Sequence, residues 1–167
     1  MHIESLEQLV NNNPSVQIVC NVGVGRHIEE AGYGYQNIPD GHEELVAGFT
    51  LRAFASQHAE IYEDVGQVEH TGYLVDGRLF LAGDSFTVPP FTVEILAPAV
   101  VAPFCTIKDT VDMVMTIQPK TVITMHDGQL NEAGHGTWYG LLERLVVDAS
   151  IHVVRFPAGT TYATPAT

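Results

Sequence analysis

Three residues whose side chains could bind a metal ion each close an apolar run of the sequence. His58 ends the run TLRAFASQH, Asp84 ends GRLFLAGD, and His126 ends KTVITMH. Imidazole and carboxylate groups suit zinc, iron or manganese. Apolar runs of this length are typical of strands, so we predict a metal site at the ends of strands.

Each of these residues also has an ordinary structural interpretation. A histidine at the end of a strand, such as His58, is often only a hydrogen-bonded structural residue. Asp84 follows Gly83, which permits a sharp turn, and an aspartate there could start an Asx-turn or cap a helix. His126 stands beside Asp127, which could orient a ring nitrogen from the second shell. Three such strand ends in one small domain favour the metal site.

Other chemistries have less support. The segment Gly23-Val-Gly25 lacks the third glycine of a dinucleotide-binding loop, because position 28 is Ile28. Ser56 and Ser85 have no GxSxG context, so a serine hydrolase is not indicated.

Cysteine and the remaining histidines add little further chemistry. Cys105 precedes a predicted helix but is most simply a buried, inert thiol. His70, just before Thr71, could lie near the metal site as a second-shell residue. The other histidines show no ligand spacing, and we expect them on the surface or in loops: His2, His27, His42, His135 and His152.

Composition limits the classes of partner. The 167 residues suit a single domain, 1–167, and residues 157–167 are expected to form a frayed tail. A formal net charge of −13 repels nucleic acid, although a metal could offset that repulsion for a small anionic substrate. No apolar run is long enough to span a membrane. The two separated cysteines favour reduced thiols and a cytoplasmic location.

The order of predicted elements is a mixed α/β pattern. The sequence Ser5-Leu-Glu-Gln8 reads as a capping box that opens a short helix, and residues 26–31 form another. Helices are also predicted after Thr106 and around Trp138. Residues 45–55 and 72–83 read as hairpins, the second with Asp-Gly at its tip. Single strands are expected at 16–20, 93–101, 121–125 and 151–156.

The segments ASQHAEIY, HTGYLVDGRLFLAGDSF and PKTVITMHDG resemble those of metallo-β-lactamase-fold hydrolases, and more closely of their ascorbate-lactonase-like (UlaG-like) branch. The resemblance implies an αββα sandwich. It implies that His58 binds one metal, that Asp84 bridges two, and that His126 binds the second. Zinc is the expected cofactor, with manganese or iron as alternatives. The implied reaction is hydrolysis of a small ester, lactone or phosphoester by a metal-bound hydroxide.

The chain departs from the family pattern because the sequence contains no HxHxDH motif. That motif supplies the remaining ligands, so the resemblance implies a fold that is incomplete at its N-terminus. Each metal would keep two protein ligands, whereas catalytic zinc usually has three plus water. We therefore expect weak metal binding and impaired hydrolysis. Two alternatives remain: a non-catalytic binding or assembly module, and a mononuclear protein that recruits His70 or Asp127.

An incomplete sandwich has a consequence for partners. Without most of the first sheet, the apolar residues of the second need another cover. We expect a homo-oligomer, or complementation by a separate N-terminal fragment, in addition to a small-molecule substrate.

Overall fold

The structure, a computed structural model, describes residues 2–65 and 68–155. It confirms the mixed α/β class, with a seven-stranded sheet and four α-helices in the described residues. The strands are β1 (Glu43–Val46), β2 (Phe49–Gln57), β3 (Glu69–Val75), β4 (Leu79–Gly83), β5 (Ile95–Pro98), β6 (Thr121–Ile123) and β7 (His152–Val154). The helices are α1 (Ile3–Asn12), α2 (Val22–Glu30), α3 (Ile107–Ile117) and α4 (Glu132–Val146), and a short 3-10 turn follows at Val147–Ala149. The predicted tail, 157–167, lies outside the described residues.

The strands of the sheet follow one another in chain order from β1 to β7. Pairs up to β3–β4 are antiparallel, and pairs from β4–β5 onward are parallel. Consequently β2, β4, β5, β6 and β7 all run in the same direction. Their carboxyl ends meet at one edge of the sheet, which is where loops can bring distant side chains together.

Both predicted hairpins are confirmed. The β1–β2 turn is formed by Ala47 and Gly48, both with positive φ (51° and 88°). The β3–β4 turn contains Asp76 and Gly77, also with positive φ (49° and 67°). Such left-handed turn residues match the twist of antiparallel strands, so local turn chemistry sets the register of both hairpins.

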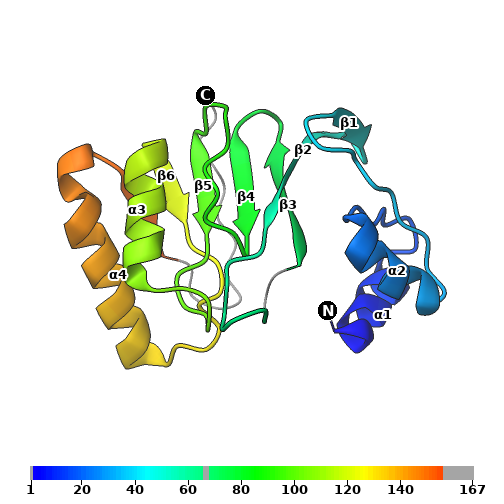
Figure 1. Cartoon of the computed structure of the whole chain (residues 1–167), viewed down its shortest axis with the longest axis horizontal. Helices are drawn as coiled ribbons and strands as arrows, with labels where there is room; N and C mark the ends of the chain where they lie inside the picture. Colours follow the sequence, from blue (N-terminus) through cyan, green and yellow to red (C-terminus); the bar gives the residue numbers. More distant parts are fainter. Residues whose placement is uncertain (1, 66–67, 156–167) are drawn as a thin grey trace.

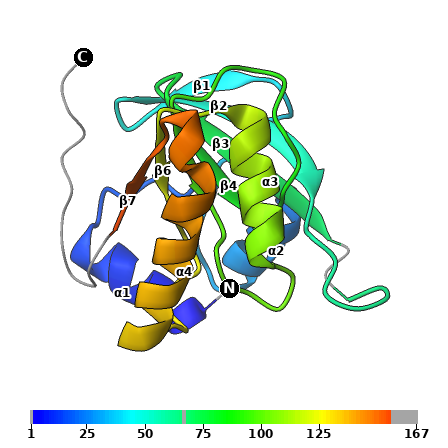
Figure 2. The ribbon, with the colours of Figure 1, turned by 90° about the vertical axis from the view of Figure 1, so that its left-hand side faces the viewer.

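Helices α3 and α4 pack side by side on one face of the sheet (Figures 1 and 2). The hydrophobic core lies between this face of the sheet and the two helices. The strands contribute Leu74, Phe80, Leu96, Val122 and Val153, and the helices contribute Met113, Val114, Leu142 and Val146. The predicted cap of α3 is confirmed, since the Thr106 side chain and the Asp109 carboxylate form a reciprocal capping box.

The opposite face of the sheet carries a smaller cluster. Ile38, Val46 and Ala53 are buried there together with Val19 and the ring of Tyr73. Helices α1 and α2 lie on the side of the molecule away from α3 and α4 (Figure 1). A groove of about 430 Å³ remains on this face; it is lined mainly by apolar side chains, among them Phe49, Leu51, Tyr73, Val75 and Leu81. We call these five residues and their surface the open face.

The N-terminal region differs from its prediction in three places. Helix α1 begins at Ile3, because the His2 ring accepts a hydrogen bond from the Ser5 N–H; the predicted Ser5 capping box is wrong. Residues 16–20 form no strand but a single bridge, Val19 to Gln36. Helix α2 starts at Val22, four residues early, because the Asn21 side chain caps it. Local caps in short helices are hard to rank from sequence alone.

No helix among the described residues is long and apolar enough to cross a bilayer.

Candidate functional site

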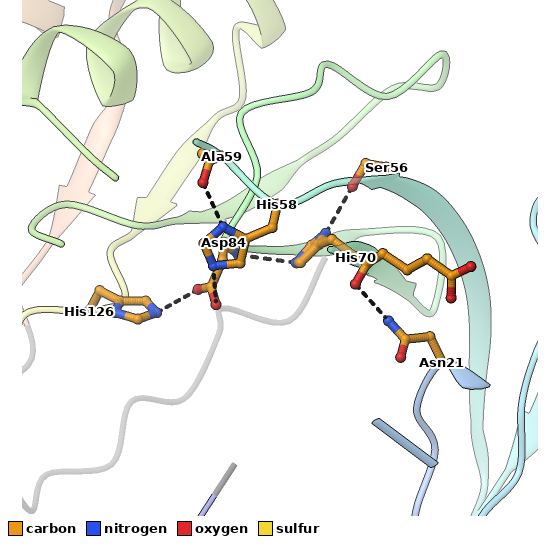
Figure 3. Close-up of polar contacts among 8 residues, drawn as sticks. Asn21, Ser56, His58, Ala59, His70, Asp84 and His126 are labelled. Atoms are coloured by element: carbon orange, nitrogen blue, oxygen red, sulfur yellow. Dashed lines mark hydrogen bonds and ion pairs between the residues drawn. The ribbon is translucent and has the colours of Figure 1, made fainter. Parts of the chain in front are cut away.

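The topology brings His58, Asp84 and His126 to the same edge of the sheet. His58 directly follows β2, Asp84 directly follows β4, and His126 lies three residues beyond β6. The backbone N–H of Ala59 donates to the Asp84 carbonyl (2.7 Å), which joins the ends of β2 and β4. Figure 3 shows the two imidazoles meeting at the Asp84 carboxylate. The structure therefore brings together all three residues that the sequence singled out.

Each oxygen of the Asp84 carboxylate faces a different histidine. Oδ1 lies 2.6 Å from Nε2 of His126, and Oδ2 lies 3.5 Å from Nε2 of His58. Nδ1 of His58 lies 2.6 Å from the carbonyl oxygen of Ala59. A carbonyl can only accept, so Nδ1 carries a proton and Nε2 of a neutral His58 presents its lone pair to the carboxylate. The three side chains remain partly accessible, with 15%, 34% and 38% of His58, Asp84 and His126 exposed.

The ring of His70 is hydrogen-bonded to the backbone of Asp84. The backbone N–H of Asp84 donates to Nε2 of His70 (3.1 Å), and Nδ1 lies 2.8 Å from the hydroxyl of Ser56. A backbone N–H is always a donor, so Nδ1 must carry the proton and donate to Ser56. Burial lowers the pKa of His70, which favours this neutral form. His70 thus has no lone pair left for a metal, and it cannot accept a proton from Ser56.

Asp127 points toward helix α4. Its Oδ2 accepts a hydrogen bond from the hydroxyl of Tyr139 (2.8 Å) and lies 3.8 Å from Nδ1 of His135. The hydroxyl of Thr124 donates in turn to Tyr139 (2.6 Å). The expected second-shell role of Asp127 at the ring of His126 stays a prediction, because the contacts that the structure describes for Asp127 lead to α4.

Phe104 is a residue of the site that the sequence did not point to. Its ring makes edge contacts with both imidazoles, with centroid separations of 4.8 Å to His58 and 5.5 Å to His126. It belongs to the loop after β5, the strand between those that precede Asp84 and His126. Its place between the predicted strand 93–101 and the Thr106 cap could have indicated a loop residue near the site. In the sequence, only Cys105 of this loop was considered as a chemical group.

Comparisons with known proteins agree with the architecture. No family model matches the chain. Protein Rv0786c of Mycobacterium tuberculosis (strain ATCC 25618 / H37Rv) is 26% identical over 148 residues, which cover 86% of this chain and 68% of that protein. Igni18, a metallo hydrolase from the archaeon Ignicoccus hospitalis, has a similar structure with a TM-score of 0.72 and 13% identity, over 97% of this chain and 74% of Igni18.

A candidate metal-dependent hydrolase from Parabacteroides distasonis is also similar in structure. Its TM-score is 0.62 and its identity is 18%, over 83% of this chain. The chain has the fold of these hydrolases. It spans 63% of the length of the Parabacteroides protein.

Within this fold, the donor set suits a divalent cation on chemical grounds. An imidazole Nε2 and a carboxylate oxygen are both ordinary zinc ligands, and here two such pairs share the Asp84 carboxylate. The lone pair of a neutral His58 and the negative Asp84 would repel each other, and a cation bound between them would relieve that repulsion. Among residues 2–65 and 68–155, no three His, Cys, Asp or Glu side chains are grouped to hold one ion. From the described residues, each ion bound here would therefore have two protein ligands.

Proposed function

We propose that the chain is part of a metal-dependent hydrolase of the metallo-β-lactamase superfamily, in its ascorbate-lactonase-like branch. Its substrate would be a small ester, lactone or phosphoester. The fold shared with Igni18 and the sequence resemblance of the strand ends support this proposal. The free thiols Cys20 and Cys105 support a cytoplasmic location.

The observation that carries the proposal is the position of Asp84 between His58 and His126. One carboxylate oxygen faces each Nε2, so we assign His58 and Asp84 to one metal ion, and Asp84 and His126 to a second. When bound, such ions polarise a scissile carbonyl or phosphoryl oxygen and lower the pKa of a water molecule. The protein residues hold and orient: Ala59 fixes the tautomer of His58, and His70 fixes the backbone of Asp84.

The small number of protein ligands should limit both zinc binding and hydrolysis by the isolated chain. Two protein ligands per ion are one fewer than catalytic zinc sites usually have. The sequence resemblance implies that a separate N-terminal fragment would supply the remaining ligands by complementation. For the isolated chain we therefore expect weak zinc binding and little hydrolysis.

Calorimetric titration with zinc tests the site. The wild type should bind zinc weakly, and Asp84→Ala should abolish binding because both ions lose their shared ligand. Asp40→Ala is a matched control. The Asp40 carboxylate accepts a hydrogen bond from the Ala55 N–H on β2 instead of facing a histidine. A nanomolar, stoichiometric site in the isolated chain would contradict the two-ligand assignment. Zinc binding that is unchanged in Asp84→Ala would contradict the site itself.

Hydrolysis of p-nitrophenyl acetate and bis(p-nitrophenyl) phosphate with added zinc tests the reaction. A slow, zinc-dependent rate that is lost in Asp84→Ala supports the hydrolase. Zinc binding without any turnover favours the second candidate, a non-catalytic binding or assembly module. The absence of a three-ligand group among the described residues is the observation that keeps this candidate open.

We also propose that the open face is a contact surface between two copies of this chain. Its groove is lined largely by apolar side chains, and Phe49, one of the five residues of the open face, is 54% exposed. Apolar surface of this kind is more often an interaction site than a solvated one. Strand β1 is an edge strand of the sheet and pairs only with β2 within the described residues, so the surface continues to a free strand edge there.

A further inference from the structure

The hydroxyl of Tyr139 joins two residues of the His126 loop. It accepts a hydrogen bond from the Thr124 hydroxyl (2.6 Å) and donates one to Oδ2 of Asp127 (2.8 Å). These two residues flank the dipeptide Met125-His126 in the chain. A single atom of α4 therefore spans the turn that carries the histidine.

The backbone of that turn is held in an unfavourable conformation. His126 has φ +63°, in the left-handed region that residues with a β-carbon rarely adopt. The conformation is strained for a residue with a β-carbon, so surrounding contacts must hold it. On the N-terminal side, Met125 is already fixed to the end of β5, because its N–H donates to the Pro98 carbonyl (2.7 Å). On the C-terminal side, the described side-chain contacts of Asp127 run to Tyr139 and His135.

We propose that Tyr139 is a positioning residue for His126. By joining Thr124 to Asp127, its hydroxyl keeps the turn in the left-handed conformation that directs Nε2 of His126 to Asp84. The consequence for hydrolysis rests on the proposed function, whereas the geometric role does not. Tyr139 touches neither Asp84 nor His126 in the described contacts, so it acts through the loop.

The surroundings of Tyr139 suit this role. The residue is only 2% exposed, and its ring stacks on His135 at 5.7 Å with Arg155 5.9 Å from the ring centroid. Removing the hydroxyl alone should leave these ring contacts in place. Burial also raises the pKa of Tyr139 to about 12, so the hydroxyl keeps its proton at ordinary pH.

Tyr139→Phe is therefore the decisive variant, and Tyr73→Phe is its matched control. Tyr73 also has a buried hydroxyl, but within the described residues that hydroxyl has no hydrogen-bond partner. The first measurement is the two-dimensional imidazole ¹H–¹⁵N spectrum of the full chain without metal. We expect the His126 signals to shift or broaden in Tyr139→Phe and to stay unchanged in Tyr73→Phe.

The second measurement is zinc affinity by calorimetry. Tyr139→Phe and Asp127→Ala should each weaken binding about 10-fold, as expected for outer-shell partners of a ligand. The double variant should be no weaker, because both changes break the same link. Asp127→Asn keeps an acceptor for Tyr139 and should retain most of the affinity.

Two results would overturn the proposal. One is a Tyr139→Phe protein that unfolds at lower temperature yet keeps the wild-type His126 signals, which would make the hydroxyl merely structural. The other is zinc affinity equal to that of the wild type in Tyr139→Phe. Failure of the wild type to bind zinc would refute the proposed function instead, and the metal-free spectra would still decide the role of Tyr139.

Discussion

Gly83 and His70 lie so close together that position 83 has no room for a side chain. A β-carbon on Gly83 would be 2.3 Å from Nε2 of His70, and Gly83 also has φ +60°. The same imidazole nitrogen accepts the N–H of Asp84. The glycine before Asp84 therefore lets His70 reach the backbone of the proposed bridging ligand.

Gly83→Ala should destabilise the protein and displace His70. Gly77→Ala is the control, because Gly77 has a similar φ of +67° but a β-carbon there would meet no described atom within 4 Å. Both variants carry the left-handed cost of about 1–2 kcal/mol. Overpacking against His70 should add about 1–3 kcal/mol for Gly83→Ala alone. Chemical denaturation measures the difference, and equal losses in the two variants would refute the close contact.

Phe104→Ala should disturb both histidines of the site at once. The ring contacts His58 and His126, so its loss should change the imidazole spectra of both residues. Because the side chain is only partly buried, we expect a loss of about 1–2 kcal/mol, below that of a fully buried phenylalanine. Phe104→Leu retains apolar volume and should have a smaller effect. A change confined to one of the two histidines would contradict the shared contact.

The α3 cap should make stability depend on pH in the acidic range. Hydrogen bonds from Thr106 lower the pKa of Asp109 in the folded protein. A lowered pKa means that the contribution is present above the unfolded-state pKa and is lost as the pH falls through the folded-state pKa. The stability difference between wild type and Asp109→Asn should therefore shrink on acidification. Asp112→Asn, which removes an exposed ion pair to Lys108 on the same helix but no cap, is the comparison variant. A difference for Asp109→Asn that grows on acidification would contradict the capping role.

Thr106→Ala tests the same cap at neutral pH. Loss of the threonine hydroxyl leaves the Asp109 N–H without its side-chain acceptor. The free energy of unfolding should fall by about 0.5–2 kcal/mol. Thr106→Ser keeps the hydroxyl and should preserve most of the stability. A loss of equal size in the serine variant would show that the cap does not depend on this hydrogen bond.

Self-association through the open face should increase with salt. The formal charge of −13 opposes contact between two copies, and added salt screens that repulsion. Sedimentation velocity over a range of protein and salt concentrations measures the dimer fraction. Phe49→Glu should reduce it, whereas Leu145→Glu, at an apolar position on α4 that is 46% exposed, should not. A stable monomer at high protein and salt concentration would count against the proposal.

Much of the fold could be predicted because its signals are local. The two turn sequences around Gly48 and Gly77, the cap at Thr106 and the apolar runs each act over a few residues. These patterns were sufficient to predict both hairpins and helix α3. Where several residues could each cap a helix, local reasoning failed: it placed the start of α1 at Ser5, but the ring of His2 provides the cap.

The sequence by itself determined that His58, Asp84 and His126 stand at the ends of apolar runs, because residue order decides which side chain follows each strand. Only the tertiary structure decided that these ends meet, since β2, β4 and β6 must run in one direction within a single sheet. It also assigned His70 to the backbone of Asp84, Phe104 to both imidazoles, and Tyr139 to the His126 loop. Each of these contacts joins residues far apart in the chain, where no local pattern specifies the partner.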